Sequence, residues 1–381
     1  MVKLYFCGHK HPIFIKMITK EAVLEALSNV QEPDLGKDLV SLNMIESIAI
    51  DGKKISFKVI LTTPACPLKE HIERACINAI HLLVDKEAEV TVIMDAKVVS
   101  NRKDNKSFLP EVKNIIIVAS GKGGVGKSTV SVNLALALAA QGAQVGLLDA
   151  DIHGPSIPMM LGIRDERPKM MDVNGKGMIL PIEKYGIKAM SIGLLIDEKQ
   201  AIIWRGPQAS SALKQFLSDV HWGALDYLII DMPPGTGDVH LTLVQTVPVT
   251  GAVIVSTPQA VAAADAKKAI VMLKQEQINV PILGIVENMS YFTPAELPKN
   301  KYYIFGKDGA KKLAEQFELN FLGEVPLVQS IREGGDSGVP AVLDDNSLSK
   351  NSFMELAGNV VRQLAIRNAQ QVKTQIVEIK N

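Results

Sequence analysis

Residues 121–129 read Gly-Lys-Gly-Gly-Val-Gly-Lys-Ser-Thr, and this stretch decides the fold of most of the chain. The apolar run at 115–119 before it predicts a short buried strand, and the Ala- and Leu-rich residues 130–141 after it predict a helix. A strand, a glycine-rich loop and a helix in this order are the context that a phosphate-binding Walker A loop requires. We therefore expect a nucleotide site at this turn rather than a glycine-rich turn without a ligand.

The residue types of this loop predict how it holds phosphate. Glycines allow backbone N–H groups to turn toward phosphate oxygens, and the N-terminus of the following helix adds the positive end of its dipole. Lys127 is expected to reach the β- and γ-phosphates, and the Ser128 hydroxyl is expected to bind Mg²⁺. The loop residues predicted to bind ATP are Gly121, Gly123, Gly124, Val125, Gly126, Lys127, Ser128 and Thr129.

Composition limits the classes of protein to which the chain can belong. Its 381 residues suit two domains, and 47% apolar with 22% charged residues is typical of a soluble globular protein. Lysine plus arginine equals aspartate plus glutamate at 41 each, which supports neither a nucleic-acid nor a membrane partner. No apolar run approaches the roughly 18–20 residues of a membrane helix, no secretory signal is evident, and three cysteines make no disulfide framework. We expect a cytoplasmic protein.

The region 113–381 alternates strand-like and helical segments, which predicts an α/β fold. Such alternation produces right-handed crossovers and a mainly parallel sheet with helices on both faces, and nucleotides bind at the carboxyl edge of such sheets. Two of its strands end in aspartates, Asp149 with Asp151 and Asp231, so their carboxylates are expected at the phosphate site. The strand candidates are 115–119, 145–149, 227–231, 252–256 and 282–286.

An early lysine in the loop, Lys122, narrows the class further. Lys-Gly-Gly-Val-Gly-Lys-Ser-Thr resembles the deviant Walker A motif of the group that includes MinD, ParA, the nitrogenase iron protein and the Mrp/ApbC proteins. The segments Asp-Ala-Asp-Ile-His-Gly-Pro-Ser at 149–156, Trp-Arg-Gly-Pro at 204–207 and Asp-Met-Pro-Pro-Gly-Thr-Gly-Asp at 231–238 resemble the Mrp/ApbC branch. The resemblance implies a P-loop ATPase that forms a homodimer, in which Lys122 reaches the partner's nucleotide.

The same resemblance assigns the remaining roles at the site. Asp151 positions the attacking water and so joins Lys122 and Lys127 as a predicted catalytic residue. Asp149, Asp231 and Ser128 hold Mg²⁺, with Asp231 as the Walker B aspartate.

Three further residues of the ATPase region receive binding roles. Gly235 donates its N–H to the γ-phosphate and loses that bond after hydrolysis. Asn288 meets the adenine edge and Pro326 packs near the base, unless both are only structural residues of their turns.

The region before the loop predicts a small α+β domain at 17–96, joined to the ATPase domain at 113–381 by a linker at 97–112. Glu-Pro-Asp-Leu-Gly at 32–36 and Leu-Thr-Thr-Pro-Ala-Cys-Pro at 61–67 resemble the MIP18-like (DUF59) domain, which is associated with iron–sulfur assembly. Cys66 lies in its cysteine motif before a helix expected from about 67 to 84, and is either an iron–sulfur ligand or a small buried thiol. Cys76 is read as a core residue, and 1–16 as a disordered extension.

The sequence departs from the Mrp/ApbC pattern where most members carry Cys-x-x-Cys. Here the segment after the last predicted strand reads Tyr-Phe-Thr-Pro-Ala-Glu-Leu-Pro at 291–298, and no cysteine follows Cys76. A [4Fe–4S] cluster normally takes four thiolates, two from each subunit if it bridges a dimer at such motifs. The ATPase domain therefore lacks ligands for the cluster that the resemblance implies.

These observations predict an ATP-binding and ATP-hydrolysing iron–sulfur cluster carrier or assembly factor. It would use ATP and Mg²⁺, turn over slowly, and act on assembly or recipient apo-proteins, with a [4Fe–4S] cluster as a candidate further group. Two alternatives stay open. One is a ParA/MinD-like positioning ATPase, and the other is an ATP-dependent assembly scaffold that does not itself hold a cluster.

Overall fold

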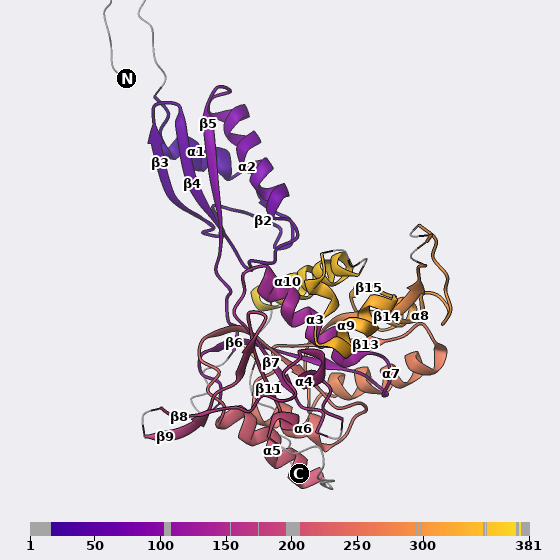
Figure 1. Ribbon diagram of the computed structural model, residues 1–381. Helices are drawn as coiled ribbons and strands as arrows, with labels where there is room; N and C mark the ends of the chain where they lie inside the picture. Colours follow the sequence, from indigo (N-terminus) through magenta and orange to yellow (C-terminus); the bar gives the residue numbers. More distant parts are fainter. Residues whose placement is uncertain are drawn as a thin grey trace, which may run out of the picture. The chain divides into compact units, whose positions relative to one another are not determined.

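A computed structural model of the chain describes residues 17–102, 108–152, 154–173, 175–195, 206–294, 296–297, 299–345, 347, 349–370 and 373–374 (Figure 1). The predicted extension 1–16 lies outside these residues. The backbone contacts divide the chain into two compact units, Met1–Val98 and Val99–Asn381. Each unit is described by itself.

The N-terminal unit is a three-stranded sheet with two helices. The sheet has the order β3 (Ile45–Asp51), β4 (Lys54–Leu61), β5 (Glu89–Ala96), with β3 antiparallel and β5 parallel to β4. Strand β4 alternates between buried and partly exposed residues, as a sheet with one covered face requires. Its buried side chains pack with those of the helices α1 (Lys20–Leu27) and α2 (Lys69–Leu83).

Helix α1 begins at a threonine cap. The Ala22 N–H donates to Thr19 Oγ1 at 3.2 Å, so Thr19 is the N-cap and the following apolar residues face the core. The short strands β1 (Gln31–Glu32) and β2 (Lys37–Asp38) pair with each other after this helix.

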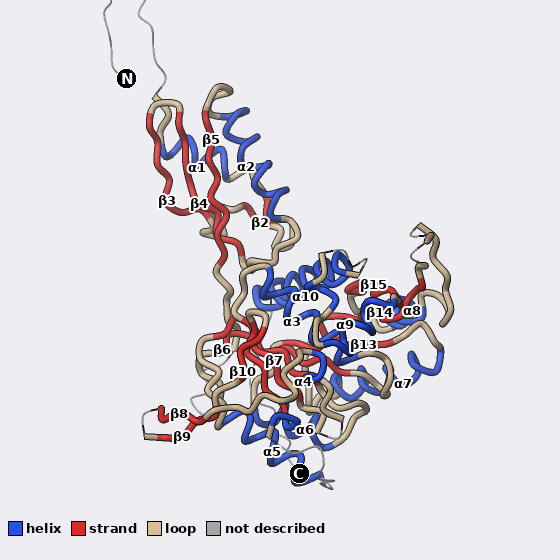
Figure 2. The backbone as a smooth tube through the Cα atoms, in the orientation of Figure 1, coloured by secondary structure: helices blue, strands red, loops and turns tan. Residues whose placement is uncertain are grey.

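The larger unit is built on a twisted sheet with helices on both faces, which confirms the predicted α/β class. Among the described residues its order is β10-β11-β7-β12-β6-β13-β14-β15, with neighbours parallel except β10 and β11. Figure 2 shows α3 and α10 over one face and α5 and α6 over the other. The strand bounds are β6 Val112–Ala119, β7 Val145–Asp149, β10 Ile182–Lys184, β11 Ile187–Ser191, β12 Leu225–Asp231, β13 Gly251–Ser256, β14 Ile282–Phe292 and β15 Phe321–Leu327.

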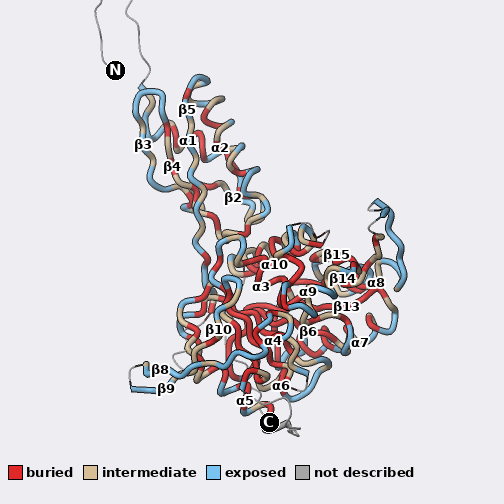
Figure 3. Tube along the Cα trace, in the orientation of Figure 1, coloured by how far each residue is buried: buried red, intermediate tan, exposed pale blue. Residues whose placement is uncertain are grey.

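The strands at the centre of this sheet are buried along their length (Figure 3). Their apolar runs pack against the helices on either side, so the core lies in two layers above and below the sheet. The described helices are α3 Lys127–Ala140, α4 Ile157–Met160, α5 Gly206–Ser218, α6 Asp238–Thr246, α7 Ala260–Lys274, α8 Gly309–Gln316, α9 Gln329–Ser337 and α10 Lys350–Gln370.

The five predicted strands all form, but the sheet extends beyond them. The prediction missed β11, β10 and β15, and it ended β14 six residues early. Strand β15 contains Gly323 and Pro326 and pairs with β14 through shifts in register, so its pattern is broken in the sequence. A two-stranded hairpin, β8 (Met170–Val173) with β9 (Lys176–Ile179), also went unpredicted.

The predicted linker is anchored at both described ends. Arg102 is 9% exposed, and its guanidinium donates to the carbonyls of Leu109 and Val112. Asn101 donates its side-chain amide to the carbonyl of Asn368 in α10 at 3.0 Å. Residues 97 and 98 belong to the smaller unit, and the described residues 99–102 and 108–112 belong to the larger one. No described helix is both long and apolar enough to cross a bilayer.

Candidate nucleotide site at the carboxyl edge of the larger sheet

The glycine-rich loop joins β6 to α3 and depends on glycine for conformation and for packing. Gly124 and Gly126 have φ values of 79° and 77°, in the left-handed region that favours glycine. A Cβ at Gly126 would lie 2.1 Å from Asn288 Nδ2, whereas one at Gly124 would meet nothing within 4 Å. A Cβ at Gly121 would lie 2.0 Å from the backbone of Asp265 in α7. Two of the predicted loop glycines are thus also required by close neighbours.

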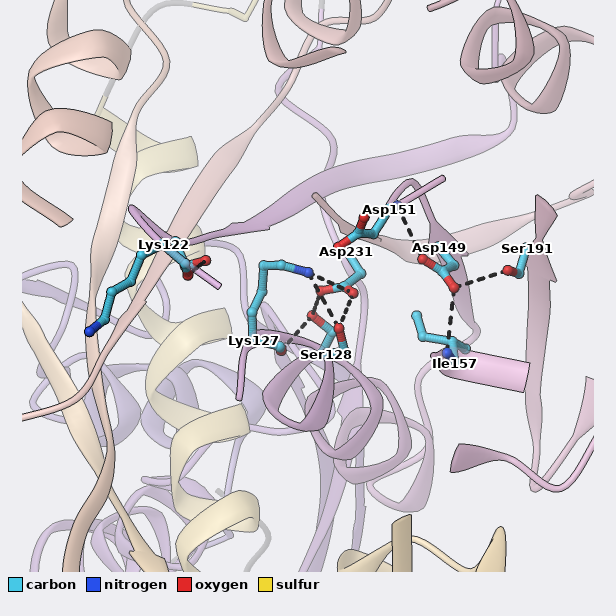
Figure 4. Close-up of polar contacts among 10 residues, drawn as sticks. Lys122, Lys127, Ser128, Asp149, Asp151, Ile157, Ser191 and Asp231 are labelled. Carbon is cyan, nitrogen blue, oxygen red and sulfur yellow. Dashed lines mark hydrogen bonds and ion pairs between the residues drawn. The ribbon is translucent and has the colours of Figure 1, made fainter. Parts of the chain in front are cut away.

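Lys127 and Asp231 form a buried ion pair at the centre of the site. Lys127 Nζ lies 2.9 Å from Asp231 Oδ2, and the two side chains are 6% and 0% exposed. Ser128 Oγ donates to the same oxygen at 2.6 Å, and Ser131 Oγ donates to Asp231 Oδ1 at 2.7 Å (Figure 4). The structure therefore brings the Walker A lysine and serine onto the Walker B carboxylate.

Ser131 is a partner that the sequence analysis did not identify. It lies three residues after Ser128 on α3, so both hydroxyls face the same side of the helix. That spacing is the signal that could have found it.

Asp149 ends β7 in a second buried carboxylate site. Its Oδ2 accepts from Ser191 Oγ at 2.9 Å and from the Ile157 N–H at 3.4 Å, and its Oδ1 accepts from the Asp151 N–H at 3.1 Å. Burial and, next, the charge of Asp231 raise the pKa of Asp149 to about 8, against the opposing effects of Ser191 and Lys127. The carboxyl group therefore favours its protonated form until a cation offsets the charge. Ser191, at the end of the unpredicted β11, was not foreseen.

The oxygen donors of this edge fit a small hard cation. Ser128, Asp149 and Asp231 supply hydroxyl and carboxylate oxygens, the ligand class that Mg²⁺ prefers. Magnesium thus fits the residues that the sequence predicted for it.

Asp151 lies next to Asp149 and Asp231, whereas Lys122 lies apart from them (Figure 4). Asp151 is half-buried beyond the end of β7, with its backbone bonded to Asp149. The Lys122 side chain is partly exposed and extends away from Lys127 and Asp231 (Figure 4). Its backbone carbonyl accepts from Ser120 Oγ at 3.0 Å, which fixes the start of the loop. The side chain of this early lysine therefore lies outside the Lys127–Asp231 cluster.

The segment after β12 lies against the loop. Gly235 has a φ of 91°, and its N–H donates to the carbonyl of Ser120 at 3.0 Å. The predicted bond from this N–H to a γ-phosphate would therefore replace the bond to Ser120. Gly235 is bonded to the P-loop strand end in the described structure.

Asn288 contacts the glycine loop from within β14. It is 4% exposed, and its Nδ2 donates to the carbonyl of Val125 at 2.8 Å. This contact occupies part of the amide that was predicted to meet adenine, and it is a structural role that the sequence analysis left open. Pro326 lies buried within β15, two strand positions from Glu324.

The two described cysteines differ in environment. Cys76 is 0% exposed inside α2, and burial, followed by Glu73, raises the pKa of its thiol to about 12. Cys66 is half-buried before α2. Within the part of the chain that the structure describes, no three His, Cys, Asp or Glu side chains are grouped to hold a metal ion. The structure thus places Cys76 in the core, as predicted.

Comparison with known proteins follows the same division of the chain. Residues 111–361 match the family model described as NUBPL iron-transfer P-loop NTPase, and residues 20–92 match the model described as iron–sulfur cluster assembly protein. The chain belongs to the NUBPL-type iron-transfer P-loop NTPase family.

Curated relatives carry a consistent description. A Synechocystis sp. iron–sulfur cluster carrier protein is 48% identical over 92% of this chain and 99% of its own length. The Escherichia coli iron–sulfur cluster carrier protein is 44% identical over 92% and 91%. A solved nucleotide-binding protein from Archaeoglobus fulgidus, in complex with ADP, is 39% identical with a TM-score of 0.55, covering 64% of this chain and 93% of its own.

These similarities confirm the recognition of an Mrp/ApbC-type iron–sulfur carrier with a P-loop NTPase domain. The ParA/MinD-like positioning role, which was the alternative, gains no support from the descriptions of these relatives. The family matches cover both units, so the small N-terminal domain is part of the carrier architecture.

Proposed function

We propose that the protein hydrolyses ATP to control a homodimeric iron–sulfur carrier that delivers clusters to recipient apo-proteins. The observation that carries this proposal is the buried arrangement of Lys127, Ser128 and Asp231 at the carboxyl edge of β6 and β12. The Archaeoglobus relative, solved in complex with ADP, supports nucleotide binding. ATP and Mg²⁺ are the proposed cofactors.

The proposed chemistry is phosphoryl transfer to water, in which the protein mainly positions groups and stabilises charge. Bound Mg²⁺ would neutralise charge on the β- and γ-phosphates. Lys127 exchanges its bond to Asp231 for phosphate oxygens, Asp151 orients the attacking water, and the Gly235 N–H leaves Ser120 for the γ-phosphate. Each of these groups already lies at the same sheet edge.

The proposed homodimer gives Lys122 its role. Its side chain extends away from the subunit's own Lys127 and Asp231, so it is free to approach a nucleotide held by a second subunit (Figure 4). Hydrolysis would then release that contact and weaken the dimer. ATP turnover would thereby be linked to a change in association.

The cargo needs ligands from outside the ATPase unit. All three cysteines of the chain, Cys7, Cys66 and Cys76, precede residue 99, and Cys76 is buried. We propose that Cys66 contributes a thiolate from each subunit and that a partner or small thiol completes the set. The cysteine-free ATPase unit also favours a second candidate, a scaffold that binds ATP and recipient proteins without holding the cluster itself.

Anaerobic reconstitution of the full chain separates these candidates. We expect a labile cluster absorbance in the parent that Cys66→Ser removes and Cys76→Ser does not. Transfer to an apo-ferredoxin is then followed with and without ATP. A parent that hydrolyses ATP but never takes up iron and sulfide would establish the scaffold and reject the carrier with its own ligands.

Hydrolysis itself is tested with Asp151→Asn, which keeps the shape of the side chain and removes the charge that orients water. We expect phosphate release to fall by about 10²–10⁴-fold while ATP affinity stays within a few-fold. The exposed Asp165→Asn is the matched control and should leave turnover unchanged. Equal turnover in Asp151→Asn and the parent would assign the role to another group.

A further inference from the structure

A buried histidine next to the site has no hydrogen-bond partner in the described structure. His240 is 2% exposed, and neither Nδ1 nor Nε2 makes a hydrogen bond of acceptable geometry with a described residue, although the Gly237 carbonyl lies near enough to act on the ring. Buried imidazole nitrogens are normally paired, because an unpaired polar group loses its bonds to water without replacement. The position therefore calls for a ligand or a functional explanation.

The fold places His240 at the nucleotide edge. It is the third residue of α6, which begins directly after the segment 232–237 that follows Asp231. Leu243 and Val244, three and four residues later, lie in the core between α6 and the sheet, so His240 continues that buried face toward the helix N-terminus. The ring is close enough to Lys127 for the ammonium charge to act on it.

The electrostatics keep the ring neutral. Burial, followed in smaller measure by Lys127, lowers the pKa of His240 to about 4, while the Gly237 carbonyl acts in the opposite direction. A neutral imidazole offers one N–H donor and one acceptor. The residue can therefore donate one hydrogen bond at neutral pH without adding a buried positive charge beside Lys127.

The start of α6 also has backbone donors to offer. Its N-cap, Gly237, has no side chain to cap the first turn, and the helix runs for nine residues. Such a terminus favours an anion, although the exposed Asp238 carboxylate in the same turn acts against one. The unpaired ring and the uncapped turn therefore occur together, directly after the Walker B strand.

A second buried polar group without a partner follows β13, the strand on the other side of β6 from β12. Thr257, 4% exposed, follows β13 and leaves its Oγ1 without a partner in the described part of the chain. The sheet order β12-β6-β13 places the segments that carry His240 and Thr257 after the two strands flanking the glycine loop. The segments that carry these two unpaired groups therefore both follow strands that are neighbours of β6, the strand before the glycine loop.

We propose that His240 donates a hydrogen bond to the terminal phosphate of ATP and so distinguishes ATP from ADP. The inference rests on the proposed ATPase function, and it adds a specificity-determining side chain to the P-loop and Walker B groups. The bond exists only while the terminal phosphate is present. Its loss after phosphate release leaves the ring unpaired again, which favours movement of the segment 232–237.

The test compares His240→Gln, which keeps a donor and an acceptor, with His240→Leu, which keeps similar bulk and removes both. Affinities for ATPγS and for ADP are measured by isothermal titration calorimetry in Mg²⁺ buffer. We expect His240→Leu to reduce the ATPγS-to-ADP affinity ratio by about tenfold or more, with ADP affinity nearly unchanged and His240→Gln close to the parent. A structural role alone would weaken both nucleotides equally, and that result would overturn the proposal.

If His240→Leu does not fold, a measurement on the parent protein tests the same proposal. In protein labelled with ¹⁵N-histidine, the His240 ring signals are expected to shift on addition of ATPγS and to stay in place with ADP. Equal shifts with both nucleotides would reject the terminal phosphate as the partner. A parent that binds neither nucleotide would instead overturn the proposed ATPase function.

Discussion

The two units of this protein bury different kinds of side chain. The N-terminal unit buries an apolar set between its sheet and two helices, exemplified by Phe57 of β4 and by Ile72 and Cys76 of α2. The carboxyl edge of the larger sheet instead buries Lys127 and Asp231. Apolar burial stabilises a fold at every stage, whereas a buried ion pair contributes little net stability because its desolvation offsets the attraction. A buried ion pair that adds little stability is better explained by a role in binding a ligand.

The largest effect is expected when the central charge is removed. Lys127→Ala takes away the ammonium that faces the phosphates, and we expect ATP affinity to fall by about a hundredfold or more. It also leaves the Asp231 carboxylate buried without its counter-charge, which costs about 3–5 kcal/mol of unfolding free energy. Mant-ATP titration and denaturant unfolding measure the two effects separately.

The matched control is a lysine–aspartate pair of the same unit outside the site. Lys113 Nζ lies 2.8 Å from Asp226, with the lysine 44% exposed. Lys113→Ala should cost about 1 kcal/mol or less and leave ATP affinity unchanged. If the two lysine variants lose equal affinity, the contrast between the site and its surroundings is rejected.

A glycine pair of the loop gives the next largest effect. Gly124→Ala and Gly126→Ala impose the same left-handed φ on alanine, about 1–2 kcal/mol each. Only Gly126→Ala also forces a methyl group against the Asn288 amide, so we expect it to lose ATP affinity by about a further tenfold. Calorimetric ATP titration of both variants gives the difference.

The double variant Gly126→Ala with Asn288→Ala identifies the cause of that difference. Removing the amide should relieve the contact and recover part of the affinity, although the bond to the Val125 carbonyl is lost. Asn288→Ala alone then measures the value of that bond and of any contact with adenine. No recovery in the double variant would show that backbone strain alone explains the loss.

The sequence identified the central residues of this site better than the residues that hydrogen-bond to them. Lys127, Ser128, Asp149 and Asp231 are identified by motif and strand end, because the chemistry of phosphate binding limits which residues can stand there. Ser191 could not be predicted in the same way, since its strand is short and pairs with β7 only through the fold.

The same limit applies to the edges of the sheet and to the unpaired histidine. Strand β15 carries a glycine and a proline that weaken its pattern, and its position depends on pairing with β14. His240 looks in the sequence like an ordinary helix residue, and only the structure shows that it is buried without a partner. Local pattern predicts elements, whereas partners across the sheet require coordinates.

A smaller effect at the site concerns association. Lys122→Ala should leave the ATP affinity of one subunit within a few-fold of the parent, because the side chain extends away from Lys127 (Figure 4). We expect it to remove the stabilisation of a dimer by ATPγS. Sedimentation velocity with and without the analogue measures this. Dimer formation equal to that of the parent would reject the role of Lys122 across an interface.

The smallest expected effect is in the N-terminal unit. It is the pH dependence of unfolding free energy that the buried Cys76 thiol causes. The pKa of Cys76 rises from its ordinary 9.0 to about 12, so the folded unit holds the thiol proton more tightly than the unfolded chain does. This contribution to stability is complete below about pH 9 and is lost as the pH rises toward 12.

Between pH 8 and pH 10 the unfolding free energy of α2 should therefore fall by about 1 kcal/mol more in the parent than in Cys76→Ala. Denaturant-dependent hydrogen exchange at residues 69–83 of the full chain measures it. Iodoacetamide at pH 8 provides the companion test, because Cys66 should react in the folded protein and Cys76 only after unfolding. Equal alkylation of Cys66 and Cys76 in the folded chain would mean that Cys76 is not protected by its burial, and the pH prediction would be rejected.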